Sequence, residues 1–158
     1  MIFITLGTQK FQLNRLLRLS DECVGNGTIS DEVIAQIGYS DYEPQNFSFY
    51  RFLDKETFNK HISDADVIIA HGGVGSIMTA LQKEKPVVVF PRLSKYGEHV
   101  DDHQVEIAHL FTEKGYVLEC GELDELPQIL NEATHYTFTK YISQTDRIVN
   151  LIRGFLQC

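Results

Sequence analysis

Short apolar runs alternate along this chain with segments of helical periodicity, and this alternation constrains the fold more than any other feature. Several runs are apolar at consecutive positions, not at every second position. Consecutive apolar residues are typical of strands buried on both faces of a sheet, and strands separated by helices usually pair in parallel. The pattern therefore predicts an α/β fold with a doubly wound parallel sheet. The six expected strands are 2–6, 32–38, 47–53, 66–70, 86–91 and 116–120.

Between these runs, apolar residues recur three and four positions apart, as they do on one face of a helix. Residues 123–130 predict a further short helix, and an amphipathic C-terminal helix is expected over about 138–156. No internal repeat or linker interrupts the pattern, so residues 1–158 are predicted to form one domain. The apolar face of the expected C-terminal helix consists of Ile148, Leu151, Ile152 and Phe155.

Charge and composition exclude several classes of protein. The net charge of -8 argues against general nucleic-acid binding, which needs a basic face. No apolar run approaches the ~20 residues that a membrane-spanning helix requires. The N-terminus lacks a basic leader and a cleavage site, so a cytoplasmic protein is expected. Cys23, Cys120 and Cys158 form no C-x-x-C pair, and a disulfide framework is not predicted.

The segment "HGGVGS", residues 71–76, lies between the fourth expected strand and a helical segment. Ligands of open parallel sheets bind beyond the carboxyl ends of the strands, where a helix N-terminus offers free N–H groups. Glycines lack the Cβ atom that would keep a phosphate away from the main-chain nitrogens. The segment therefore predicts a phosphate site in which a Cβ at Gly73 or Gly75 would block the anion. A tight turn with no ligand is the alternative.

Other phosphate and hydrolase motifs fit this segment poorly. A dinucleotide fingerprint would place a glycine at Met78, and a P-loop would end in G-K-[ST], which is absent. Ser76 does not lie in a G-x-S-x-G elbow, so a hydrolase triad is not predicted. Phosphate binding remains, without a dinucleotide or a P-loop.

A second polar cluster, "PRLSKYGEHVDDHQ" at 91–104, follows the fifth expected strand and opens another helix. Asp101 or Asp102 can cap this helix, which places His103 and Gln104 in its first turn. From there their side chains can reach sugar hydroxyl groups. Alternatively, the aspartates are only caps and the histidines only surface residues.

The same cluster contains possible phosphate and metal ligands. Arg92 and Lys95 are expected to compensate phosphate charge. His99 and His103 are spaced i, i+4 and with Asp102 suggest a metal site. No H-E-x-x-H pattern surrounds them, so no metal is predicted.

In this order and spacing, "HGGVGS" and "PRLSKYGEHVDDHQVE" resemble the donor-binding C-terminal domain of glycosyltransferase family 28, over nearly the whole chain. The resemblance implies a Rossmann-like domain equivalent to the C-terminal half of a GT-B glycosyltransferase. Within the family the chain is similar to the small donor-binding subunits of two-component transferases. These include the cytosolic subunit that makes lipid-linked chitobiose and the bacterial exopolysaccharide or capsule subunits, which the second segment resembles most.

The resemblance also assigns roles to individual residues. The position that usually carries an acidic ribose ligand in the family is Thr79 here, which accepts at most one hydrogen bond from the ribose. The resemblance implies donor diphosphate binding by Gly72, Gly73, Gly75 and Ser76 with His71 at the edge and by Gly7 and Thr8; sugar binding by Asp102, His103 and Gln104; and uracil binding by Phe52 and Leu53.

The implied function is the donor-binding catalytic subunit of a two-component glycosyltransferase. It would move a hexose from a UDP-sugar to a lipid-linked oligosaccharide for extracellular polysaccharide synthesis, without a cofactor. UDP-galactose is one candidate donor, and N-acetylglucosamine or glucuronic acid are the others. A membrane-attached partner would supply the acceptor-binding domain and recruit the chain to the inner face of the plasma membrane.

The catalytic base is not identified by the sequence, and His71 and His103 are the candidates. A non-catalytic nucleotide-sugar-binding or regulatory subunit is the alternative function. A surface that binds the partner can also drive self-association, so a homo-oligomer is expected to be possible in isolation.

Overall fold

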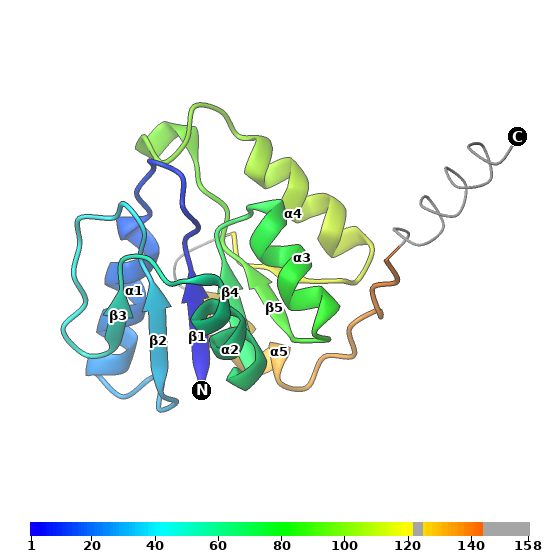
Figure 1. The fold of residues 1–158 in the computed structure, drawn as a ribbon, viewed down its shortest axis with the longest axis horizontal. Helices are drawn as coiled ribbons and strands as arrows, with labels where there is room; N and C mark the ends of the chain where they lie inside the picture. Colours follow the sequence, from blue (N-terminus) through cyan, green and yellow to red (C-terminus); the bar gives the residue numbers. More distant parts are fainter. Residues whose placement is uncertain (122–124, 144–158) are drawn as a thin grey trace, which may run out of the picture.

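Six parallel strands form one sheet in the order β3-β2-β1-β4-β5-β6, with helices packed on both faces (Figure 1). This computed structural model describes residues 1–121 and 125–143. Each of the six expected strands is present, although each is shorter than the apolar run that predicted it. The doubly wound α/β fold predicted from the sequence is therefore confirmed. The strands are β1 (Ile2–Thr5), β2 (Val33–Gln36), β3 (Ser48–Tyr50), β4 (Val67–Ala70), β5 (Val87–Val89) and β6 (Leu118–Glu119).

The chain order reverses beside β1. From β1 the chain builds β2 and β3 on one side and then crosses to β4 on the other, where Ile2 pairs with both Val33 and Val67. The connections after β1 and β4 therefore leave in opposite directions and open a crevice at the carboxyl edge of the sheet.

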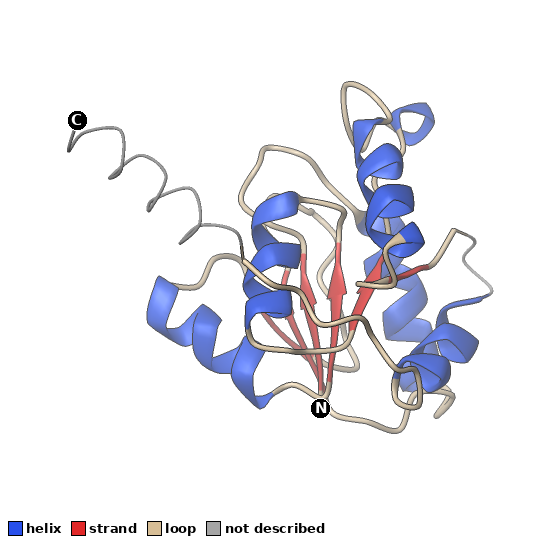
Figure 2. Cartoon of the chain, turned by 90° about the vertical axis from the view of Figure 1, so that its right-hand side faces the viewer, coloured by secondary structure: helices blue, strands red, loops and turns tan. Residues whose placement is uncertain are grey.

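Two hydrophobic layers enclose the sheet, which Figure 2 shows edge-on between helices. Along β1, Ile2 and Ile4 face the layer that contains α1 and α5, while Phe3 faces the layer of α2, α3 and α4. Because both faces are covered, all four residues of β1 are buried, which explains its continuous apolar run. The helices are α1 (Asn14–Gly25), α2 (Lys55–Asp64), α3 (Val74–Gln82), the short 3-10 helix η1 (Ser94–Tyr96), α4 (His103–Glu113) and α5 (Leu126–Ala133).

The segment after α5 crosses from one layer to the other. The Thr139 N–H donates to the carbonyl of Gly115 over 2.8 Å, Phe138 packs on the α1 layer and Tyr141 on the α4 layer. Residues 138–143 are therefore not the first turns of the expected C-terminal helix, because tertiary contacts hold them in a non-helical path. The rest of that prediction, 144–156, lies outside the described residues.

Candidate functional site

A cleft of about 440 Å³ lies at the carboxyl edge of the sheet, where β1 and β4 diverge. The loops that follow β1, β4 and β5 meet at this end (Figure 1). Most residues assigned to the diphosphate and the sugar thus share one cavity. The lining residues are Thr8, Gln9, His71, Gly72, Gly73, Val74, Gly75, Ser76, His99, His103, Gln104 and Ile107.

The glycine loop leads directly from β4 into α3. Gly72 has a φ of 86°, which favours glycine, and a Cβ there would lie 3.0 Å from Cβ of Gln104. Gly73 occupies the N-cap of α3 and makes no side-chain cap, so the first N–H groups of α3 remain available to an anion. A Cβ at Gly75 would meet open space. Of the three glycines in this loop, Gly75 is thus the one at which a side chain would meet no neighbouring atom.

His71 explains why two other glycines are required. Its ring is 5% exposed and lies where Cβ atoms of Gly7 and Gly73 would be, at 2.6 Å from Cε1 and 2.2 Å from Nε2 respectively. A Cβ at Gly73 would therefore collide with His71, which the sequence did not predict, whether or not it also blocks a phosphate.

The protonation state of His71 follows from its surroundings. Its Nδ1 lies 3.1 Å from the carbonyl oxygen of Thr5, which can only accept, so Nδ1 carries the proton and Nε2 is an acceptor in the neutral ring. Burial and the positive charge of Arg92 lower the pKa of His71 to about 4. At neutral pH the ring is therefore uncharged and a weak base.

Two further histidines line the cleft. His103 is exposed, and its Nδ1 lies 3.0 Å from Oε2 of Glu106. The ring of His99 packs against Phe11 at 4.7 Å between centroids, and its Nδ1 lies 2.9 Å from an oxygen of Asp101. From the sequence, His99 was weighed as a metal ligand and as a surface residue of the polar cluster, and the structure places it in the cleft lining.

At the start of α4 the two aspartates have different partners. Asp101 accepts the N–H of His103, whereas Asp102, at the N-cap position, accepts the N–H of Ser94 and does not line the cleft. Gln104 is 5% exposed and lines it, with its Oε1 accepting the N–H of Arg92 over 3.3 Å. Gln104 therefore lies in the cleft lining, whereas Asp102 is bonded to the preceding loop.

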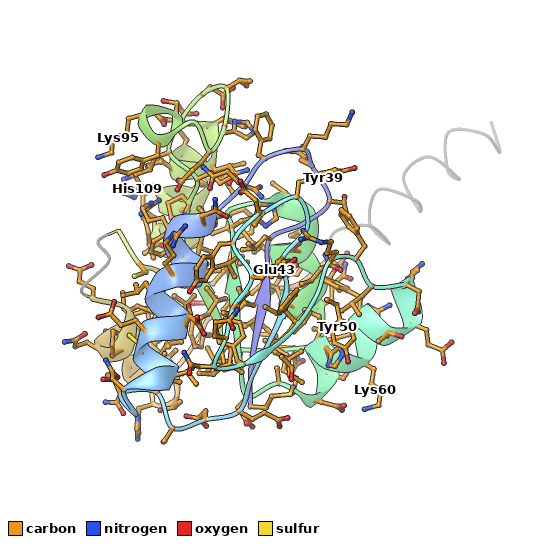
Figure 3. The ribbon with its side chains drawn as sticks, turned by 90° about the vertical axis from the view of Figure 1, so that its left-hand side faces the viewer. Tyr39, Glu43, Tyr50, Lys60, Lys95 and His109 are labelled. Carbon is orange, nitrogen blue, oxygen red and sulfur yellow. The ribbon has the colours of Figure 1, made fainter. Side chains whose placement is uncertain are left out.

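Arg92 and Lys95 were expected to compensate phosphate charge, but neither side chain lines the cleft. Arg92 is fully buried and donates to main-chain carbonyls of the β1–α1 loop. Lys95 is exposed at the edge of the molecule, with Nζ 4.9 Å from the ring centroid of Tyr96 (Figure 3). Direct compensation of phosphate charge by either side chain is contradicted by these positions.

The residues assigned to uracil and ribose also lie outside the cleft lining. Phe52 is 48% exposed and its ring meets Tyr39 edge-on at 5.1 Å, while the Leu53 N–H donates to Oε1 of Gln36. The hydroxyl of Thr79 donates to the carbonyl of Gly75, one turn earlier in α3. Tyr39 was not considered from the sequence, since a lone exposed tyrosine carries no motif.

Comparison with known proteins identifies the family. Residues 1–146 match the profile of the glycosyltransferase family 28 C-terminal domain. The chain belongs to this family. The family 28 domain is 31% identical over 142 residues to the UDP-N-acetylglucosamine transferase subunit ALG13 of Candida albicans, covering 89% of this chain and 45% of that protein. It is 30% identical to the human ALG13 subunit, covering 75% of this chain and 11% of the human protein. The chain thus spans less than half of these relatives.

Solved structures support the same fold for the family 28 domain. The glycotransferase of kitacinnamycin has a TM-score of 0.63 at 21% identity, covering 84% of this chain and 34% of that one. MurG of Acinetobacter baumannii has a TM-score of 0.58 at 18% identity, covering 96% and 49%. These likenesses confirm the expected relation to GT-B glycosyltransferases at the level of the fold.

Within residues 1–121 and 125–143, no group of three or more His, Cys, Asp or Glu side chains is arranged to hold a metal ion. In the same part of the chain, no helix is both long and apolar enough to cross a bilayer.

Proposed function

We propose that this family 28 domain is the donor-binding catalytic subunit of a two-component glycosyltransferase that transfers a sugar from a UDP-sugar to a lipid-linked oligosaccharide. The observation that carries the proposal is that three segments converge on one cleft where β1 and β4 diverge. They are the glycine loop (71–76), the first glycine turn (6–9) and the start of α4. This is where open α/β sheets bind nucleotides.

Sugar transfer requires stabilisation of the departing diphosphate. The uncapped start of α3 supplies N–H groups and the positive end of a helix dipole, with the hydroxyl of Ser76 beside them. The Oε1 atom of Gln104 is already engaged by Arg92, so its amide N–H groups are the part that serves the sugar.

Activation of the acceptor hydroxyl requires a base. His71 is poorly suited, because its pKa is lowered to about 4 by burial and by Arg92. His103 remains a candidate in the cleft wall. The proposal therefore assigns the acceptor, and with it the usual place of the base, to a membrane-attached partner that recruits this cytoplasmic chain to the plasma membrane.

The names of the two ALG13 relatives support UDP-N-acetylglucosamine as the first donor to test. They give no support to extracellular polysaccharide synthesis, which rests on the likeness of the segment at 91–106 alone. UDP-galactose and UDP-glucuronic acid are the comparison donors. Because the proposal includes no metal, UDP binding is expected to be unchanged by EDTA.

Calorimetric titration of the purified chain with UDP and the three UDP-sugars tests the proposal. We expect UDP to bind and one UDP-sugar to bind more tightly than the other two. No binding of any nucleotide, with or without membranes that carry the partner, would reject the function. Binding without sugar transfer in the complete complex would favour the non-catalytic subunit.

A further inference from the structure

Arg92 lies beneath the loop between β1 and α1 and donates to three of its carbonyl groups. The side chain is 0% exposed. Its Nη2 donates to the carbonyl of Leu6 over 2.7 Å and to that of Phe11 over 3.0 Å, and its Nε to that of Gln12 over 3.4 Å. One guanidinium thus holds both ends of the loop that carries Thr8 and Gln9 into the cleft.

The guanidinium is charged and only partly neutralised. Burial lowers the pKa of Arg92 to about 10, so it remains protonated at neutral pH. The nearby Glu98, 1% exposed, also receives two hydrogen bonds of 3.0 Å from Arg15. Glu98 is therefore paired with Arg15, and Arg92 has no ion-pair partner among the described residues. The positive charge of Arg92 acts on His71 in the cleft lining, because it helps to lower the pKa of that histidine.

The hydrogen bond from Arg92 to Leu6 also fixes the direction of the next main-chain N–H group. In a trans peptide the carbonyl and the N–H point in opposite directions. Since the Leu6 carbonyl points to Arg92, the N–H of Gly7 points away from it, and the φ of 69° at Gly7 turns the chain toward Thr8. The lining of the cleft contains no lysine or arginine among the described residues, so a lysine or arginine charge that acts on a diphosphate would come from outside the lining.

The main chain of Arg92 is bonded to Gln104, which lines another part of the cleft. Its N–H donates to Oε1 of Gln104, whose Cβ would be 3.0 Å from a Cβ at Gly72. Arg92, in the loop after β5, thus contacts the β1–α1 loop through its side chain and Gln104 of α4 through its N–H. Gln104 in turn lies beside Gly72 in the loop after β4.

We propose that Arg92 is the positioning residue of the diphosphate site: it shapes the 6–12 loop so that main-chain N–H groups face the anion, and it supplies positive charge from beneath without touching the ligand. The proposal rests on the function proposed above, because it takes the diphosphate of a UDP-sugar as the anion.

Three variants test it: Arg92→Lys keeps the charge but loses the forked donors, Arg92→Met loses both, and Lys95→Met removes an exposed cation of the same segment. We expect Arg92→Lys to weaken UDP binding at least tenfold and Arg92→Met further, with Lys95→Met within twofold of wild type. Amide hydrogen exchange should accelerate at 7–9 in the two Arg92 variants while β4 and β5 keep their protection. UDP affinity within twofold of wild type in an Arg92→Lys variant that keeps its β4 and β5 protection would overturn the proposal.

If the variants do not fold, the wild-type chain decides. UDP and inorganic pyrophosphate should each protect the amides of 7–9 together with those of 72–76. Protection of 72–76 alone would overturn the role of Arg92. Binding of pyrophosphate without UDP would reject the nucleotide but leave the anion site, whereas binding of neither would reject both this inference and the proposed function.

Discussion

At the scale of single residues, His71 links the cleft to the stability of the fold. The unfolded chain binds a proton at His71 near pH 6.5, whereas the folded chain does so only near pH 4. Stability from the neutral buried ring is therefore complete above pH 6.5 and is lost as the pH falls toward 4. We expect the free energy of unfolding to fall by about 2 kcal/mol more between pH 7 and pH 5 in wild type than in His71→Gln. Urea titrations at both pH values measure this.

The matched control is His103→Gln, since His103 is exposed and borders the same cleft. Its pH dependence should follow wild type. If His71→Gln loses as much stability on acidification as wild type does, the ring is not the buried neutral group described above.

Gly73 and Gly75, two residues apart, should respond differently to the same methyl group. Gly73→Ala places a Cβ 2.2 Å from Nε2 of His71, so overpacking should destabilise the fold by about 1–3 kcal/mol. Gly75→Ala meets open space in the first turn of α3 and should leave stability unchanged or raised by up to about 1 kcal/mol, while it weakens UDP binding. Thermal unfolding and calorimetry separate the two effects. Unchanged UDP affinity in Gly75→Ala would mean that the loop is only a turn.

At the scale of elements, α3 contains Thr79 at the position where the family usually has an acidic ribose ligand. The Thr79 hydroxyl donates to the carbonyl of Gly75, so it can only accept a hydrogen bond from a ribose hydroxyl. Thr79→Glu restores the acidic residue that the family resemblance implies, and glutamate suits a helix better than threonine. We expect a several-fold gain in UDP affinity, measured by calorimetry, with Thr79→Gln as the uncharged control. Equal affinity in all three proteins would show that the ribose is held elsewhere.

Element types were predictable from the sequence, and their ends were not. Continuous apolar runs identified β1, β4 and β5 because both faces of the sheet are buried there, whereas the edge strand β3 is exposed at Ser48 and Tyr50. The expected helix beginning near 138 was not observed at 138–143, because Thr139 is bound to Gly115 and Phe138 packs into the other layer. Helical periodicity reports one apolar face, and a segment that crosses between two layers can show the same spacing.

At the scale of the whole molecule, the cleft lies at the carboxyl edge of the sheet. We expect the isolated chain to bind UDP-sugar but to transfer little or no sugar, because transfer needs an acceptor site and a base that we assign to the partner. Purified chain, donor and lipid-linked acceptor, mixed with and without membranes that carry the partner, provide the assay. Full turnover without those membranes would refute the split enzyme and make His103 the first base to mutate.

The sequence by itself determined the strand and helix order, the position of the glycine loop and the polar start of α4, because these depend on local periodicity and on motifs of a few residues. Only the tertiary structure decided what those residues contact. Arg92 points under the first glycine turn, Asp102 turns to Ser94, and His71 fills the space beside Gly7 and Gly73. The physical reason is that each of these contacts joins segments brought together by the fold, and burial and hydrogen bonding set side-chain direction and charge only after those segments meet.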